Sequence, residues 1–136
     1  MKELNIGVLG LQGDIEEHVA ATRLALERMN LEGNVLLIKT AEGAGAVDGL
    51  IIPGGESTVM GGLSSPKQTL QTIQQRIREG MPVLGTCAGL ILLSRKVLDR
   101  VVGKTNQPLL GVMDIVIERN AFGRQRESFE ADLDIP

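Results

Sequence analysis

The sequence has 136 residues, 43% of them hydrophobic and 23% charged, which suits one compact domain with a sizeable core. Its net charge of −3, its scattered basic residues and its lack of Trp and Tyr argue against nucleic acid as the main partner, because phosphates require clustered Lys and Arg and bases stack on aromatic rings. The N-terminus does not read as a signal peptide, and no apolar stretch approaches membrane-spanning length, so we expect a cytoplasmic protein with no membrane partner.

Five short apolar runs, closed by Gly or Pro, predict strands along the chain. Most of these runs do not alternate apolar with polar residues, which is typical of strands that are covered on both faces of a parallel sheet. The runs are Leu4–Leu9, Val35–Ile38, Leu50–Ile52, Val83–Leu84 and Val112–Ile117.

The first predicted helix lies between the first two strands. It starts at Asp14, which is placed as an N-cap, with Glu17 three residues later. Its apolar side chains are Ile15, Val19, Leu26 and Met29. After the second strand, the Gly- and Ala-rich segment Ala41–Val47 is predicted to be a loop.

The second predicted helix has one apolar face and ends at Gly80, a natural residue to follow a helix end. Its apolar face consists of Leu70, Ile73 and Ile77. A third helix is predicted from Ala88 to about Leu98, with a buried start, and Asp99–Pro108 is predicted to be a loop. Strands that alternate with helices imply right-handed βαβ crossovers, so we expect a three-layer α/β/α domain with a mainly parallel sheet.

The segment Gly85-Thr86-Cys87-Ala88-Gly89 is the most informative one for chemistry. A buried strand ends and an apolar helix begins there, which is the nucleophile-elbow pattern with Cys in place of Ser. Such a turn leaves no room for Cβ atoms beside the nucleophile, and it places the sulfur at a helix N-terminus, which favours the thiolate. The Ala88 N–H is then available as an oxyanion donor. The alternative is a small buried Cys that packs as a hydrophobe.

A second motif, Pro53-Gly54-Gly55-Glu56-Ser57, also follows a buried strand. Backbone N–H groups at such a turn can bind an anion or a developing oxyanion. Taken alone, the motif is equally a tight turn that is followed by an ordinary helix cap. It gains weight because both motifs end strands of one predicted parallel sheet, and ligands bind at the carboxyl ends of such strands.

Together, these two motifs resemble those of the triad (class I) glutamine amidotransferases. More narrowly, the chain is similar to the family of glutaminase subunits of pyridoxal 5'-phosphate synthase. Further blocks carry the narrower resemblance and span nearly the whole chain in the family's order. They are Gly7-Val8-Leu9-Gly10-Leu11-Gln12-Gly13, Glu17-His18, Glu118-Arg119-Asn120-Ala121-Phe122-Gly123-Arg124-Gln125 and Ser128-Phe129-Glu130-Ala131-Asp132-Leu133.

The resemblance implies a role for each site residue. Cys87 would attack the side-chain amide carbon of L-glutamine, and the N–H groups of Gly55 and Ala88 would form the oxyanion hole. The residues that would hold the substrate are Gly55, Glu56, Ser57 and Arg119. The alternative for Arg119 is a surface arginine in a solvated loop, which is the commoner location of Arg in proteins. Ammonia would pass to a synthase (lyase) subunit in a hetero-oligomeric complex that builds pyridoxal 5'-phosphate. Neither a metal nor another cofactor is expected, because one Cys and one His cannot build a typical structural zinc site.

The chain departs from the family pattern in one respect. The base and its orienter are a His and a Glu in a His-Pro-Glu segment of a late strand, and the sequence contains no such segment. We therefore interpret residues 1–136 as a single amidotransferase domain without its C-terminal third, with little activity alone. His18 is the only histidine, and it is interpreted as a partly exposed helix residue without a catalytic role.

Three other functions stay open at this point. The chain could be another Cys hydrolase on a similar elbow, of the α/β-hydrolase or DJ-1-like type. It could be a catalytically silent subunit that only docks to its partner. A flavodoxin-like nucleotide-binding domain is disfavoured, because Gly10-Leu11-Gln12-Gly13 is not a dinucleotide-binding fingerprint.

Overall fold

The structure is a computed structural model, and it describes residues 3–10, 15–53, 64–100, 103–104, 108–119, 121–122 and 129–136. The strands are β1 (Leu4–Leu9), β2 (Gly33–Ile38), β3 (Gly49–Ile52), β4 (Val83–Gly85), β5 (Ser94–Asp99), β6 (Gly103–Lys104) and β7 (Met113–Arg119). The helices are α1 (Ile15–Arg28), α2 (Ala41–Gly45), α4 (Pro66–Arg78) and α5 (Ala88–Leu93). All five predicted strands are confirmed, with β1 at its predicted bounds.

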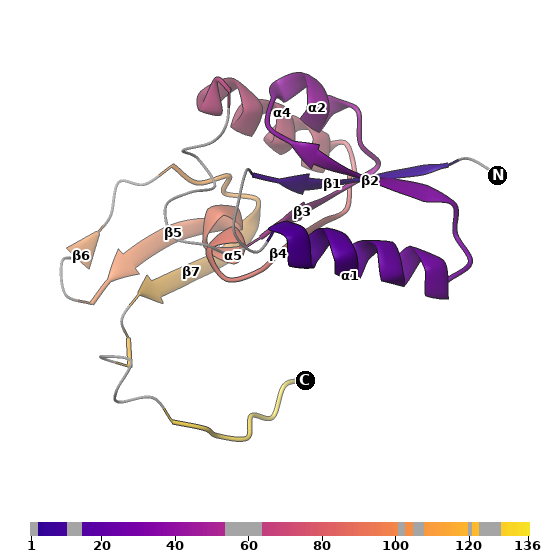
Figure 1. The fold of residues 1–136 in the computed structure, drawn as a ribbon. Helices are drawn as coiled ribbons and strands as arrows, with labels where there is room; N and C mark the ends of the chain where they lie inside the picture. The colour runs from indigo at the N-terminus through magenta and orange to yellow at the C-terminus, as the bar shows by residue number, and fades with distance from the viewer. Residues whose placement is uncertain are drawn as a thin grey trace.

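The central sheet has four parallel strands in the order β2-β1-β3-β4. Helix α1 lies on one side of it, and α2 and α4 lie on the other (Figure 1). This arrangement confirms the predicted α/β/α layers and the mainly parallel sheet. A second sheet, in the order β6-β5-β7, pairs β5 in parallel with β7 and antiparallel with β6.

The core lies mainly between the central sheet, α2 and α4. Val8 and Leu9 are successive residues of β1 and both are fully buried, as expected for a strand covered on both faces. On the edge strand β2, Leu36 and Leu37 are partly exposed, and so is Val116 of β7. The prediction of a strand buried on both faces is therefore wrong for β7, whose residues are all exposed or half-buried.

The third predicted helix is wrong beyond Leu93. Residues 94–99 form β5, because the carbonyl groups that would continue the helix have other partners. Leu92 O accepts a hydrogen bond from Leu110 N, and Leu93 O accepts one from Val112 N. The hydroxyl of Ser94 also donates to Ile91 O at 2.6 Å, which satisfies the last turn of α5.

Both predicted loops contain regular structure. Segment 41–47 includes the short helix α2, which starts because Thr40 Oγ1 accepts a hydrogen bond from Gly43 N at 3.0 Å. Segment 99–108 includes β6, a strand of two residues. The Gly and Ala content of segment 41–47 suggests a loop, but the N-cap at Thr40 outweighs it and starts a helix.

The predicted end of α4 is confirmed. Gly80 has a φ of 103°, its N–H donates to Ile77 O, and the N–H of Met81 donates to Arg76 O. This pattern is the Schellman motif, in which a left-handed residue lets the chain turn back over the last carbonyl groups. The predicted N-cap of α1, Asp14, lies outside the described residues.

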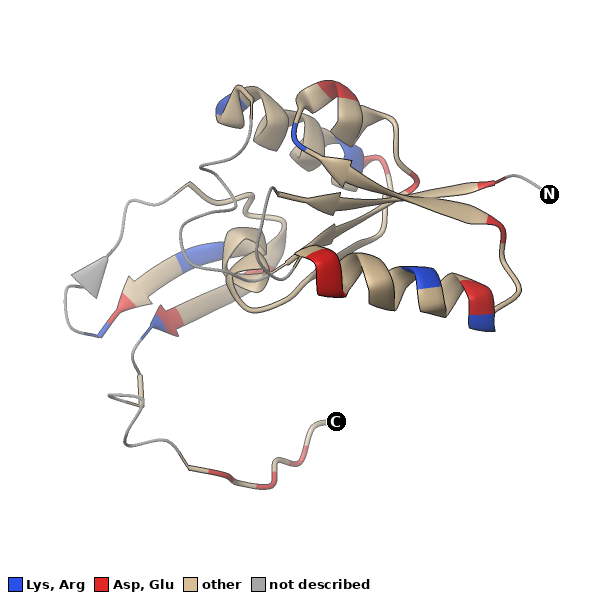
Figure 2. Cartoon of the chain, in the orientation of Figure 1, with Lys and Arg blue, Asp and Glu red and all other residues tan. Residues whose placement is uncertain are grey.

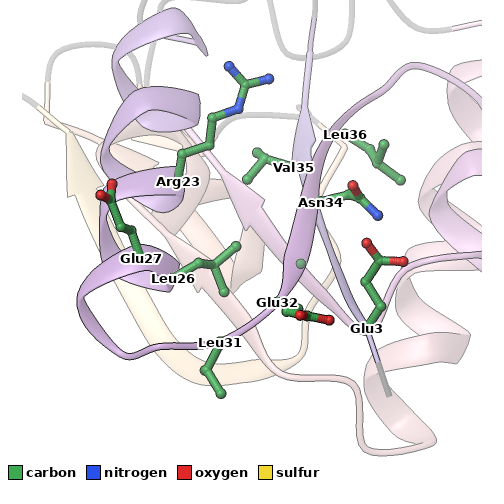
Figure 3. Close-up of a pocket in the computed structure, with 10 residues that line it drawn as sticks. Glu3, Arg23, Leu26, Glu27, Leu31, Glu32, Asn34, Val35 and Leu36 are labelled. Atoms are coloured by element: carbon green, nitrogen blue, oxygen red, sulfur yellow. The ribbon is translucent and has the colours of Figure 1, made fainter. Parts of the chain in front are cut away.

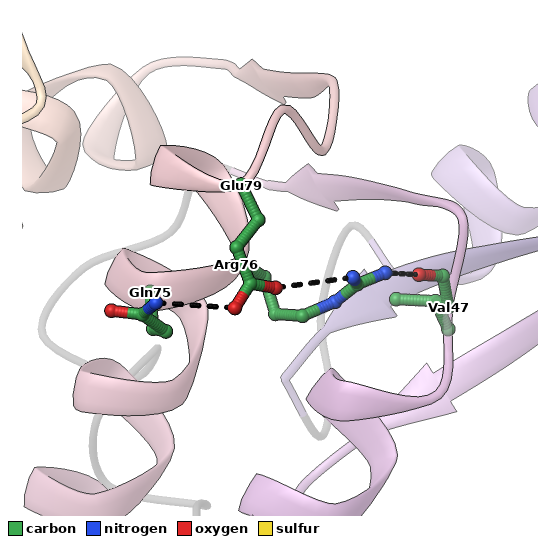
Figure 4. Close-up of polar contacts among 4 residues, drawn as sticks. All are labelled: Val47, Gln75, Arg76 and Glu79. Atoms are coloured by element: carbon green, nitrogen blue, oxygen red, sulfur yellow. Dashed lines mark hydrogen bonds and ion pairs between the residues drawn. The ribbon is translucent and has the colours of Figure 1, made fainter.

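Arg76 joins α4 to the segment before β3 (Figure 4). Its Nη2 donates to the carbonyl oxygen of Val47 at 2.6 Å, and its Nη1 lies 3.6 Å from a carboxylate oxygen of Glu79. Gln75 donates to the same carboxylate group at 3.1 Å. Because Val47 is buried, its carbonyl needs a partner from the protein, and Arg76 supplies it.

Charged residues are spread over the fold (Figure 2). Lys and Arg occur on α1, α4, β5 and β7 and do not gather on one element. The charged residues of the last eight positions, 129–136, are all acidic; they are Glu130, Asp132 and Asp134. Among the described residues, no helix has the length and apolar character that crossing a membrane requires.

Candidate active site

The two sequence motifs start at neighbouring strand ends. Strand β3 pairs in parallel with β4, and Ile52 lies opposite Gly85 in the register. Pro53 and Thr86 therefore leave the same edge of the sheet side by side, at the carboxyl ends of the strands. The prediction that both motifs follow strands of one parallel sheet is confirmed. The carboxyl edge of such a sheet is where open α/β folds bind ligands.

Cys87 occupies a strained turn between β4 and α5. Its backbone has φ 52° and ψ −115°, a conformation that residues with a Cβ rarely adopt, and its side chain is exposed. Such a residue costs on the order of 1–3 kcal/mol and persists only where its surroundings enforce it. The strain and exposure fit a nucleophile elbow and do not fit a buried Cys that packs as a hydrophobe.

Two glycines make this turn possible because other groups occupy the space of their missing side chains. A Cβ on Gly89 would lie 1.9 Å from the carbonyl oxygen of Ile52, which belongs to the backbone of β3. A Cβ on Gly85 would lie 2.7 Å from Leu93 and 2.8 Å from the backbone of Gly89. Helix α5 therefore packs directly against the ends of β3 and β4, which fixes the position of Cys87 between them.

Thr86 makes three hydrogen bonds beside Cys87. Its N–H donates to Ile52 O at 3.0 Å, and its carbonyl accepts from Gly89 N at 2.8 Å. Its hydroxyl pairs with His18 Nε2 at 3.1 Å. The half-buried state of His18 matches its interpretation as a partly exposed helix residue, but the contact with the elbow was not predicted. Its place one turn into α1, just after the carboxyl end of β1, is the signal that could have indicated it.

Of the other predicted site residues, the structure describes Ala88 and Arg119. Ala88 is the first residue of α5, so its N–H has no acceptor within the helix. Gly55, Glu56 and Ser57 lie outside the described residues. Arg119 is the exposed last residue of β7, opposite Asp99, the last residue of β5. Strand β5 follows directly after α5, and no hydrogen bond or ion pair joins Arg119 to residues 85–89 in the described part of the chain.

A pocket of about 550 Å³ lies between α1 and β2 (Figure 3). It opens at the amino ends of β1 and β2, next to Glu3 and Glu32, whereas Cys87 lies at the opposite edge of the sheet. Because open α/β sheets bind their ligands at the carboxyl ends of the strands, this pocket is not part of the candidate active site.

The close approach of Ile52 O to Gly89 predicts how one methyl group added at position 89 changes the stability of the fold. We expect Gly89→Ala to destabilise the fold by about 3 kcal/mol or more, because a backbone oxygen cannot move aside as a side chain can. Urea unfolding followed by circular dichroism measures this loss. Gly45→Ala is the matched control, since its Cβ would lie 3.9 Å from Thr72, and it should be neutral or slightly stabilising. Equal unfolding midpoints for Gly89→Ala and the unchanged chain would contradict the close contact.

Comparison with known proteins identifies relatives along nearly the whole chain. A model of the SNO glutamine amidotransferase family matches residues 8–136. The pyridoxal 5'-phosphate synthase subunit PdxT of Staphylothermus marinus is 49% identical over 130 residues, which make up 96% of this chain and 63% of that protein. The subunit of the same name from Hyperthermus butylicus is 53% identical over 131 residues, 96% of this chain and 62% of that protein.

A solved structure agrees with these relatives. A crystal structure of a glutamine amidotransferase matches with a TM-score of 0.68 and 41% identity, over 93% of this chain and 62% of the other. The chain thus spans less than two thirds of the length of each of these three proteins. The extent of the family match and the identity to these relatives show that the chain belongs to the SNO glutamine amidotransferase family.

Proposed function

We propose that this chain acts as a glutaminase, which hydrolyses L-glutamine to L-glutamate and ammonia through a thioester on Cys87. The observation that carries the proposal is Cys87 at a positive φ, exposed at the carboxyl edge of the sheet in a member of this family. The Cys87 thiolate adds to the side-chain amide carbon, the amide nitrogen receives the proton that the thiol has given up, and the carbon–nitrogen bond breaks as ammonia leaves. Water then hydrolyses the glutamyl thioester, which releases glutamate and restores the thiol.

The neighbouring groups would serve this reaction in distinct ways. The N–H groups of Ala88 and Gly55 would stabilise the oxyanion of the tetrahedral intermediate. Glu56 and Ser57 would help to hold the substrate. Arg119 would bind its carboxylate, since guanidinium pairs with carboxylate through two parallel hydrogen bonds.

We also propose a partner and a compartment for the protein. Two relatives are named as subunits of pyridoxal 5'-phosphate synthase, which supports a synthase subunit as the acceptor of the ammonia. Delivery within a hetero-oligomeric complex would keep the ammonia from bulk water. The protein would act in the cytoplasm, in vitamin B6 biosynthesis, without a metal, another cofactor, nucleic acid or membrane as partner.

A glutamine analogue tests the assignment of Cys87. A diazo-ketone analogue of L-glutamine should alkylate the chain once, and peptide mass spectrometry should locate the adduct on Cys87, the only cysteine. L-Glutamine should slow the labelling, and Cys87→Ser should abolish it. Another Cys hydrolase on the same elbow would react with iodoacetamide but would not react preferentially with this analogue, and that result would sink the proposal.

Labelling of Cys87 does not require catalytic turnover, and we expect little turnover from this chain. Residues 1–136 contain no His-Pro-Glu segment, and the one histidine pairs with Thr86, so we expect the purified 136-residue chain to release little ammonia from glutamine. The measurement is glutamate production by the chain alone and with a synthase subunit, with an intact homologue as the positive control. Turnover near that of the homologue would contradict the expectation. Complex formation without any labelling of Cys87 by the glutamine analogue would favour the docking function.

A further inference from the structure

The side chain of His18 links helix α1 to the nucleophile elbow. His18 lies in its first turns, at the end of α1 that faces α5 (Figure 1). The His18 Nε2 lies 3.1 Å from Thr86 Oγ1, although the two residues are 68 positions apart in the sequence. Both side chains are half-buried, so water competes only in part for the hydrogen bond.

Thr86 is the residue through which this contact reaches Cys87. Its backbone N–H and carbonyl are bonded to β3 and α5, at 3.0 Å and 2.8 Å. The hydroxyl is the remaining polar group, and His18 takes it. Because the next peptide leads into a residue at φ 52°, every group that restrains Thr86 also opposes relaxation of Cys87.

Helix α1 is held on the sheet by apolar side chains, independently of the hydrogen bond between His18 and Thr86. Ile15 is 4% exposed, and Leu26 lies near the backbone of Gly33 at the other end of the helix. Burial of Ile15 anchors the start of α1, and the half-buried Leu26 adds a contact near its end. Burial of an aliphatic side chain outweighs one partly solvated hydrogen bond. The loss of the His18 ring should therefore leave α1 docked, and Thr86→Val tests the bond to the elbow separately.

We propose that His18 is a positioning residue for Cys87, acting through the hydroxyl of Thr86 to hold the strained elbow in its reactive conformation. The proposal rests on the assignment of Cys87 as the nucleophile. His18 acts on the backbone that carries the thiol and takes no part in the transfer of the substrate's protons. It adds a residue from α1 to a site whose other members come from the two sheet-end motifs and β7.

The test is the rate at which iodoacetamide alkylates Cys87, the only cysteine of the chain. We expect His18→Ala and Thr86→Val each to slow alkylation about threefold to tenfold, the size of effect expected for one ordinary hydrogen bond. The double variant should be no slower than the slower single variant, because both changes remove the same bond. His18→Gln should retain most of the rate, since its amide reaches about as far as Nε2.

Controls separate positioning from loss of structure. Glu27→Ala removes an exposed side chain at the far end of α1 and should change neither the rate nor the thermal unfolding temperature. Thr86→Val leaves α1 intact, so its alkylation rate tests the positioning role even if His18→Ala does not fold. Wild-type rates for Thr86→Val, or losses that multiply in the double variant, would overturn the positioning role. A His18-dependent alkylation rate without any labelling by the glutamine analogue would keep this role and overturn the glutaminase proposal.

Discussion

The carbonyl oxygen of Ile52 occupies the place where a side chain of residue 89 would have to lie. A Cβ at that position would approach the oxygen to 1.9 Å, so only glycine allows α5 to pack against the end of β3. The same oxygen accepts the hydrogen bond from Thr86 N, which ties the residue before the nucleophile to the same strand. One backbone group thereby sets where α5 begins and how Cys87 is presented.

The positive φ of Cys87 is a consequence of this packing. Strand β4 ends beside Ile52, and the chain must reverse into α5 within two residues, because Gly85 and Gly89 lie against each other. The turn leaves no ordinary backbone conformation for the residue at its apex. Strain at Cys87 is therefore maintained by the close contacts of its neighbours, and the bond between Thr86 and His18 adds a restraint from helix α1.

The elements that sequence could predict are those set by local patterns. Continuous apolar runs predicted the strands, and Gly80 predicted the end of α4, because these signals act within a few residues. Helix α5 ends five residues before its predicted end, because the N–H groups of residues 110 and 112 donate to its last carbonyl groups. These donors lie far along the chain, so the local sequence pattern of the helix does not reveal them. The pairing of His18 with Thr86 was missed for the same reason, as it joins segments 68 positions apart.

Protection of Cys87 by substrate tests directly whether the elbow is a glutamine site, and it does not require turnover. The measurement is the rate of Cys87 alkylation by iodoacetamide at rising concentrations of L-glutamine, with D-glutamine as the control. We predict a saturable decrease in rate with L-glutamine and none with D-glutamine. An alkylation rate that is unchanged by L-glutamine, at concentrations far above the usual range of Michaelis constants, would show that the elbow is not a glutamine site.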